Sequence, residues 1–204
     1  RMFANLIAPL AATGALRHVS ILQGSKAYGA HVHPVTVPLR ERAPRDDHAN
    51  FYWLHEDRLR EAAASGRFDF TIWRPQVILG TAPGSAMNPV AALGAYAAIC
   101  RERKLPFVLP GAGDALLELA DAGLLAQALE WAATDSAAAG QIFNITNGDV
   151  FVLAHIWDAL AEMLGLSCIG PAPSTFASFF SEPASEQAWE TLARRERLVE
   201  PSLS

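Results

Sequence analysis

Two side chains in this sequence could stabilise negative charge on a substrate oxygen if the fold brings them together. Tyr52 lies in the run Asn50–Asp57, and Lys26 lies in the run Leu22–Gly29. A free tyrosine has a pKa near ~10, but a neighbouring ammonium group and the positive end of a helix both favour the phenolate and lower that pKa. A tyrosine in such a place can hydrogen-bond a substrate carbonyl and stabilise the oxyanion that forms during reaction. The two residues therefore predict carbonyl chemistry.

The elements around these residues predict that both lie at one edge of a parallel sheet. Residues 17–22 and 68–73 are short runs rich in β-branched and aromatic side chains, which is typical of buried strands. Residues 50–65 begin at a capping residue and end before a glycine, which is typical of a helix. Lys26 follows the first strand, and Tyr52 begins the helix between the two strands. Because ligands collect beyond the carboxyl ends of parallel strands, we expect both side chains at the same rim.

The rest of the chain continues this alternation of strands and helices, which predicts an α/β fold with a mainly parallel sheet. Residues 30–49 are polar and carry several prolines, so we expect a long surface loop there, of the kind that forms lids or binding segments. The other expected elements are helices over 2–15, 89–103, 115–133 and 150–164, and strands over 107–109 and 141–146.

Composition excludes several classes of protein. The 204 residues are 51% hydrophobic and 18% charged, so the chain can bury a core and is not disordered. The net charge of −5 and the scattered basic residues argue against a nucleic-acid partner. The longest apolar run is too short to cross a bilayer, so we expect no membrane association and a cytoplasmic protein. Cys100 and Cys168 lie in apolar surroundings and are expected to be small buried residues rather than a disulfide.

Three ordered motifs give the chain a specific resemblance. Together they resemble the progesterone 5β-reductase/iridoid synthase-like branch of the short-chain dehydrogenases/reductases, and the resemblance extends from about Val19 to Leu166. The matching stretches are Leu22–Gly29, Asn50–Trp53 with Glu56 and Asp57, and Trp73–Pro75 with Ile78, Gly80, Pro83, Ser85, Met87 and Asn88; Ala97–Cys100 and Phe143–Phe151 resemble later stretches.

The resemblance implies a Rossmann-like, doubly wound fold and an oxidoreductase that uses NADPH, with NADH still allowed. The implied reaction reduces a carbon–carbon double bond conjugated to a carbonyl, or a related carbonyl, in a small-molecule substrate. In this branch the tyrosine corresponds to Tyr52 and the lysine to Lys26, and both are implied as catalytic and cofactor-binding residues. The other implied cofactor contacts are Leu22, Gln23, Pro75, Val77, Ile78, Ser85, Ala86 and Met87; Tyr28 and Met87 are implied to contact the substrate.

The sequence departs from the family pattern at three points. The lysine motif is one residue shorter, and Trp53 stands where the motif has a second tyrosine. The glycine-rich loop that holds the cofactor pyrophosphate has no counterpart here, so we expect that N-terminal unit to precede Arg1. On this view residues 1–150 are the C-terminal part of a cofactor domain that carries the catalytic motifs, and 151–204 are part of a smaller substrate-binding domain. A homodimer is allowed, and the sequence does not decide the assembly.

Two other functions remain open. A nucleotide-sugar epimerase or dehydratase on the same fold normally carries a lysine four residues after the tyrosine, where this chain has Glu56. A cofactor-binding protein without turnover is the second alternative. The histidines His31, His33 and His48 lie in the proline-rich loop without the ligand spacing of a recognised site, so no metal is expected.

Overall fold

The chain folds into two compact units. The computed structural model describes residues 2–82 and 88–203. The first unit comprises Arg1–Ile78 and Glu118–Asp149, and the second comprises Leu79–Leu117 and Val150–Ser204. Residues 79–117 thus pack with the C-terminal part of the chain. The division into a cofactor domain over 1–150 and a substrate-binding part over 151–204 assigns functions, and it stays a prediction.

A parallel three-stranded sheet forms the centre of the first unit. Its strands are β1 (His18–Leu22), β2 (Asp69–Pro75) and β6 (Gln141–Ile145), in the order β1-β2-β6. Leu22 lies opposite Trp73, and Trp73 lies opposite Phe143. All three strands therefore end at the same edge, as the sequence predicts for an α/β protein with a mainly parallel sheet.

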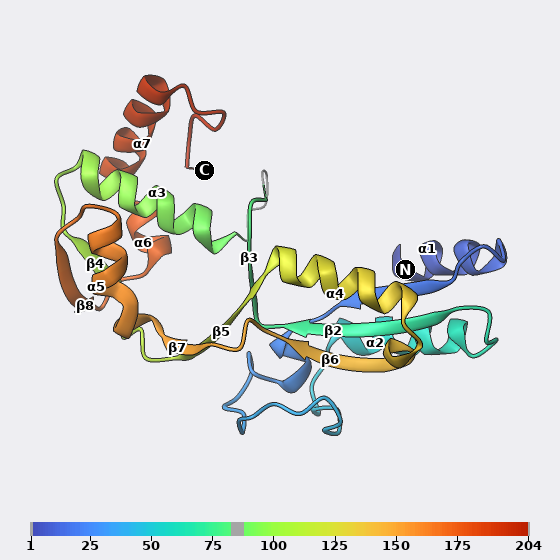
Figure 1. Cartoon of the computed structure of the whole chain (residues 1–204). Coiled ribbons are helices and arrows are strands. Elements are labelled where there is room, and N and C mark those ends of the chain that lie inside the picture. Colours follow the sequence, from blue (N-terminus) through green and yellow to red (C-terminus); the bar gives the residue numbers. More distant parts are fainter. Residues whose placement is uncertain (1, 83–87, 204) are drawn as a thin grey trace. The chain divides into compact units, whose positions relative to one another are not determined.

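Helices cover both faces of this sheet. The helices α1 (Met2–Ala12) and α2 (Phe51–Ala63) pack on one face, where Leu59 of α2 meets Phe70 and Ile72 of β2. The helix α4 (Ala122–Thr134) packs on the other face, over the alternate residue Trp73 (Figure 1). Because alternate residues of β2 point to opposite faces, both faces of the strand are buried, which is the arrangement of a doubly wound fold.

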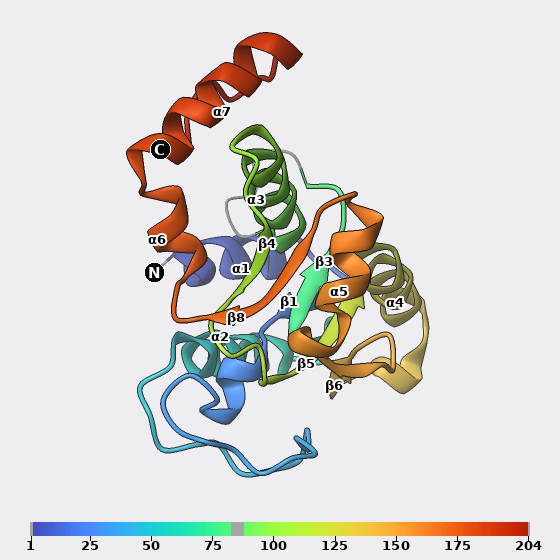
Figure 2. The ribbon, with the colours of Figure 1, turned by 90° about the vertical axis from the view of Figure 1, so that its left-hand side faces the viewer.

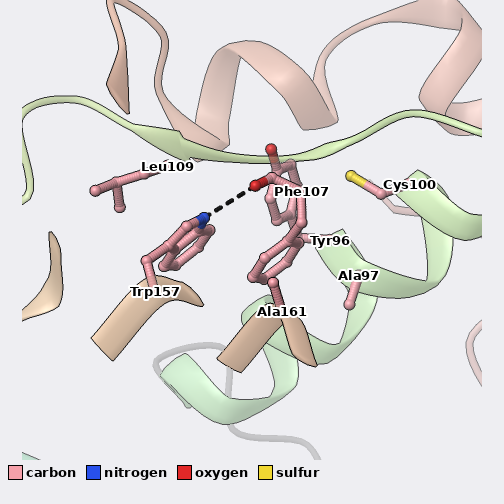
Figure 3. Packing of buried hydrophobic residues seen from close by; sticks show 7 residues of the cluster. All are labelled: Tyr96, Ala97, Cys100, Phe107, Leu109, Trp157 and Ala161. Carbon is pink, nitrogen blue, oxygen red and sulfur yellow. Dashed lines mark hydrogen bonds between the residues drawn. The ribbon is translucent and has the colours of Figure 1, made fainter. Parts of the chain in front are cut away.

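The second unit has its own small sheet and its own core. Strands β4 (Phe107–Pro110) and β8 (Cys168–Ala172) pair in parallel (Figure 2). In the core, the ring of Trp157 stacks on Phe107, with centroids 4.3 Å apart and an interplanar angle of 4° (Figure 3). The indole nitrogen of Trp157 donates a hydrogen bond of 3.0 Å to the Phe107 carbonyl. The helices of this unit are α3 (Pro89–Glu102), α5 (Leu153–Met163), α6 (Phe176–Phe180) and α7 (Pro183–Glu196).

Three short strands correct the sequence-based assignment. The strands β3 (Val77–Leu79), β5 (Leu116–Asp121) and β7 (Val150–Val152) form a second three-stranded sheet. The helix predicted over 115–133 is therefore wrong in its first part. The carboxylate of Asp121 accepts hydrogen bonds from the amides of Gly123 and Leu124, which fixes the start of α4 at residue 122.

Strand β2 also runs further than predicted. The predicted strand ends at Trp73, but Arg74 and Pro75 also pair, with Asn144 and Ile145 of β6. A proline is tolerated at this position because it is the last residue of the strand, where few ladder hydrogen bonds remain to be made. The loop predicted after β1 contains a turn of 3₁₀ helix, η1 (Ser25–Tyr28).

Both cysteines are free thiols, as predicted. Cys100 is buried, whereas Cys168 is partly exposed, so the expectation of a buried residue is wrong for Cys168. A hydrogen bond with the Asp158 carboxylate, together with burial, raises the pKa of the Cys168 thiol to about 11. Within residues 2–82 and 88–203, each helix is too short or too polar to serve as a membrane span.

Candidate active site

Gly24 is the point at which the three predicted stretches meet. It lies two residues after the end of β1, and the amide of the intervening Gln23 still bonds to the Trp73 carbonyl of β2, at 2.8 Å. A Cβ atom on Gly24 would lie 3.2 Å from the carbonyl oxygen of Pro75 and 3.8 Å from the hydroxyl oxygen of Tyr52. The Tyr52 hydroxyl therefore lies beside the carboxyl ends of β1 and β2, on the rim where the sequence places it.

Asn50 joins the helix that carries Tyr52 to the turn that carries Lys26. Its side-chain oxygen accepts the amide N–H of Tyr52 at 3.0 Å, which caps α2. Its side-chain nitrogen donates to the backbone carbonyl of Lys26 at 2.9 Å. One side chain thus holds the backbones of both predicted catalytic residues. The Lys26 side chain itself is exposed.

The environment of Tyr52 differs from the sequence-based expectation in one respect. Burial raises the pKa of the Tyr52 phenol above its ordinary value of 10.0, whereas the sequence predicted a lowered pKa. The physical reason is that burial removes water from the phenolate, and this loss of solvation favours the neutral phenol. At neutral pH Tyr52 is therefore a neutral phenol, and a neutral phenol can donate a hydrogen bond to an oxyanion.

Tyr28 is fixed by contacts at both its hydroxyl group and its ring. The hydroxyl donates a hydrogen bond of 2.6 Å to the side-chain oxygen of Asn144 at the end of β6. The guanidinium of Arg74 lies 4.9 Å from the ring centre, and its Nε donates to the side-chain oxygen of Gln23 at 2.9 Å. Tyr28 also borders a hollow of about 560 Å³, whose other lining residues come from 33–47.

Glu56 lies one helical turn after Tyr52 and is buried among three arginines. Its carboxylate is 3.0 Å from Arg60, 3.3 Å from Arg45 and 3.7 Å from Arg74. The side chains of Glu56 and Arg74 are only 6% and 5% exposed. This buried charge cluster attaches α2 to the end of β2, and it occupies the position at which the epimerase alternative needs a lysine.

The remaining predicted cofactor contacts lie at the ends of β1 and β2, in the strand β3 that follows β2, or outside the described residues. Gln23 is buried, and its side-chain nitrogen has no hydrogen-bond partner among the described residues. Leu22 and Ile78 are 46% and 38% exposed, although both are large apolar residues. Pro75 is buried and Val77 is partly buried. Ser85, Ala86 and Met87 lie outside the residues that the structure describes.

Asn144 and His48 organise this rim, although the sequence analysis gives neither residue a role in positioning the site. Asn144 accepts the Tyr28 hydroxyl, and its own amide groups bond to Glu41 and to the Leu39 carbonyl. The sequence did contain an indication of this role, because Asn144 is a polar residue near the end of a predicted buried strand. His48 lies within hydrogen-bond distance of Asp46 through Nδ1 and of Asn50 through Nε2. Within residues 2–82 and 88–203, no cluster of three or more His, Cys, Asp or Glu side chains is arranged to hold a metal.

Comparison with characterised proteins supports the resemblance that the motifs indicate. No family model matches the chain. The chain is 32% identical to (S)-8-oxocitronellyl enol synthase from Catharanthus roseus over 214 positions, which cover 99% of the chain and 55% of that protein. It is 33% identical to 3-oxo-Delta(4,5)-steroid 5-beta-reductase from Arabidopsis thaliana over 201 positions, which cover 92% of the chain and 51% of that protein. The chain is a homologue of these enzymes. The resemblance to the progesterone 5β-reductase/iridoid synthase-like branch is therefore confirmed, and the chain spans about half the length of these relatives.

Two solved structures share the fold of this chain. RMD from Pseudomonas aeruginosa, solved with NADPH, matches 86% of the chain and 63% of its own with a TM-score of 0.64 at 17% identity. A short-chain dehydrogenase/reductase superfamily protein from Agrobacterium tumefaciens, solved with NAD, matches 96% of the chain and 74% of its own with a TM-score of 0.64 at 15% identity. At these identities the likeness concerns the fold, and it confirms the Rossmann-like class.

Proposed function

We propose that the protein is an NADPH-dependent oxidoreductase that reduces the carbon–carbon double bond of α,β-unsaturated carbonyl compounds. The observation that carries this proposal is the Tyr52 hydroxyl beside Gly24 and Pro75, at the carboxyl edge of a parallel sheet. Homology to an enol synthase and to a steroid 5β-reductase supports the same class of substrate. NADH remains the alternative cofactor, because the sequence features that choose between the two are not among these residues.

The residues on this rim fit a bound nicotinamide cofactor. The unpaired side-chain nitrogen of Gln23 is a buried donor that a ligand oxygen would satisfy. Leu22, at the end of β1, and Ile78, three residues after β2, are large apolar side chains that stay exposed and that a bound nicotinamide would cover. In this proposal Lys26 binds the cofactor ribose, and Pro75 and Val77 line the nicotinamide. NADPH, when bound, supplies a hydride to the β-carbon of the substrate.

Tyr52 is assigned the role of oxyanion donor. As hydride reaches the β-carbon, negative charge moves to the carbonyl oxygen and an enolate forms. The neutral phenol of Tyr52 donates a hydrogen bond to that oxygen, which stabilises the developing charge more than it stabilises the uncharged carbonyl. A proton from water then completes the saturated product. The raised pKa of Tyr52 suits this role because a phenolate could not donate the hydrogen bond.

The nucleotide-sugar alternative has less support. It calls for a lysine at the position of Glu56, whose carboxylate is buried against Arg74 and Arg60. A lysine here would put a fourth positive charge beside three arginines, at a large electrostatic cost. Interconversion of a sugar nucleotide without net consumption of cofactor would nevertheless restore this alternative.

The test of the proposal is enone-dependent oxidation of NADPH by the full-length protein, followed as loss of nicotinamide absorbance. Tyr52→Phe is expected to lower kcat by about 100-fold, because it removes one pre-placed oxyanion donor. The Kd for NADPH should stay within about twofold, since the phenol ring is retained. The matched control is Leu54→Ala, on the same helix at a side chain that is 67% exposed, and it should leave kcat unchanged.

Two results would contradict the proposal. A Tyr52→Phe variant with the wild-type rate would remove the role assigned to the hydroxyl. Binding of NADPH without turnover on a broad panel of small enones would instead favour a cofactor-binding protein that performs no reduction.

A further inference from the structure

The loop between η1 and α2 contains a continuous line of side-chain hydrogen bonds that leads to Asn50. His33 Nε2 lies 2.8 Å from one carboxylate oxygen of Asp46, and His48 Nδ1 lies 2.5 Å from the other. The second ring nitrogen of His48, Nε2, lies 3.1 Å from the side-chain nitrogen of Asn50. Asn50 then bonds to the Lys26 carbonyl and the Tyr52 amide, so the line ends at the backbones of both proposed catalytic residues.

The orientation of the Asn50 amide is fixed by two backbone groups. Its oxygen accepts the Tyr52 N–H, and its nitrogen donates to the Lys26 carbonyl. If the amide were rotated by 180°, its nitrogen would face the Tyr52 N–H and its oxygen would face the Lys26 carbonyl, and both hydrogen bonds would be lost. The group that faces His48 is therefore an N–H donor.

This orientation determines the protonation of the His48 ring. Because Asn50 presents a donor, His48 Nε2 must accept and carries no proton. The proton of the neutral ring is then on Nδ1, where it bonds to the Asp46 carboxylate at 2.5 Å. In this state both N–H groups of the Asn50 amide and its oxygen all have partners. A second proton on His48 would place two donors against each other.

The surroundings of Asp46 and His48 favour this arrangement. The side chain of His48 is 10% exposed and that of Asp46 is 22% exposed. Burial alone would raise the pKa of Asp46, but the hydrogen bonds from His48 and His33 outweigh it and hold the pKa below its ordinary value of 3.8. Asp46 is therefore a carboxylate at neutral pH. The His48 ring also makes an edge-type contact with the ring of Trp53 in α2, with centroids 6.2 Å apart.

We propose that His48 is a positioning residue for the reaction: as its Nδ1–H tautomer, held by Asp46, it accepts a hydrogen bond from Asn50 and so fixes the Lys26 turn against the first turn of α2. The inference rests on the proposed function for its effect on turnover, while the tautomer can be tested without any activity. His48 would not touch substrate or cofactor. It would act by holding Asn50 in the one orientation that serves both backbones.

The first test determines which ring nitrogen of His48 carries the proton in the full-length protein. With ¹⁵N-labelled histidine, the ring nitrogens of a neutral Nδ1–H form are distinguishable from those of the Nε2–H form, and the His48→Gln variant assigns the signals. We expect His48 in the Nδ1–H form at neutral pH. A neutral Nε2–H form, or a doubly protonated ring, would overturn the proposal whether or not the protein reduces enones.

The second test compares two substitutions of similar polarity at position 48. In His48→Gln the side-chain oxygen can occupy the place of Nε2 and still accept from Asn50. In His48→Asn the side-chain nitrogen can replace Nδ1 and bond to Asp46, but no acceptor reaches Asn50. We expect kcat with NADPH and a small enone to fall about 10-fold in His48→Asn, below the ~100-fold cost of a 1 Å displacement of a reacting group. His48→Gln should stay within about threefold of wild type.

A purely structural role would give a different pattern. It would lower the folded fraction of both variants while leaving kcat per folded molecule and the Kd for NADPH unchanged. Val32→Ala is the matched control, because the Val32 side chain is 57% exposed in the same loop, and it should retain the wild-type kcat. Equal losses of kcat in His48→Gln and His48→Asn would contradict the positioning role.

Failure of the proposed function is distinguishable from failure of this inference. If the wild-type protein reduces no enone, amide hydrogen exchange at Tyr52 still reports the link, because the Tyr52 N–H bonds to Asn50. We expect that amide to exchange faster in His48→Asn than in His48→Gln. The same exchange rate in both variants and in the wild type would show that His48 does not hold Asn50.

Discussion

Asn50 connects three parts of the proposed site through one side-chain amide. Its sequence position suggests only a helix cap, and the structure confirms that cap at the Tyr52 amide. The same side chain also holds the Lys26 carbonyl and faces His48. The position of the Tyr52 hydroxyl therefore depends on the backbone before the helix as well as on the helix itself. The pKa of Tyr52 determines whether its hydroxyl can donate a hydrogen bond to the substrate oxygen at a given pH.

The alkaline limit of the reaction follows from that pKa. Burial raises the folded-state pKa of Tyr52 above 10.0, so the phenol stays protonated through neutral and moderately alkaline pH. Its contribution to stability is fully present below the unfolded value of 10.0 and is lost as pH rises through the folded value. We expect kcat to lose its Tyr52-dependent component only above pH 10, and the ultraviolet difference titration of wild type against Tyr52→Phe should place this ionisation there. An ionisation near pH 8 would instead support a phenolate stabilised by Lys26.

The helix α2 is the element that carries the site to the sheet edge. It begins at the cap that holds Tyr52, and one turn later it buries Glu56 against Arg74 of β2. Further along, Leu59 packs in the apolar core over β2. A polar contact and an apolar contact thus fix the same helix at successive turns, and the polar contact is the one closer to the site.

The two glutamates of α2 offer a matched test of this attachment. Glu56→Ala leaves the Arg74 guanidinium buried without its carboxylate, so we expect the free energy of unfolding to fall by about 3 kcal/mol or more. Glu61→Ala removes an exposed pair with Arg58, whose side chains are 62% and 68% exposed, and should cost less than about 1 kcal/mol. Both substitutions add the same alanine helix propensity, so their difference in urea unfolding isolates burial. Similar losses in the two variants would show that the buried charges do not anchor α2.

The strands and helices of the first unit were predictable where the local sequence carries a clear strand pattern or a helix cap. The strands β1 and β6 are β-branched and apolar, and α2 has a capping residue, so their positions followed from local sequence. The helix predicted over 115–133 is wrong in its first part because leucine and alanine favour a helix locally, whereas pairing within the sheet β3-β5-β7 overrides that preference. The N-cap at Asp121 marks the true boundary between β5 and α4. The line from Asp46 to Asn50 could not be predicted, because its geometry depends on the path of a proline-rich loop.

At the scale of the whole molecule, the described hydrophobic clusters do not span the two units. One cluster of the first unit lies around Ile72 and another around Trp73. The clusters of the second unit lie around Phe107 and around Ile99. A cluster confined to one unit stabilises chiefly that unit, so the two are expected to open separately. The proposed catalytic residues Tyr52 and Lys26 both belong to the first unit, so a substitution in the core of the second unit should leave their surroundings folded.

Phe107→Ala should destabilise the second unit selectively. Phe107 is fully buried and stacks on Trp157, so its truncation leaves a cavity and is expected to cost about 3–5 kcal/mol. Hydrogen exchange should show lost protection in residues 88–117 and 150–203, while β1, β2 and β6 of the first unit keep theirs. Val199→Ala is the control, because its side chain is 92% exposed in the same unit, and it should change stability by less than about 0.5 kcal/mol. Equal loss of protection in both units would mean that the chain unfolds as one cooperative body, and the Tyr52 site would then depend on the second core as much as on its own.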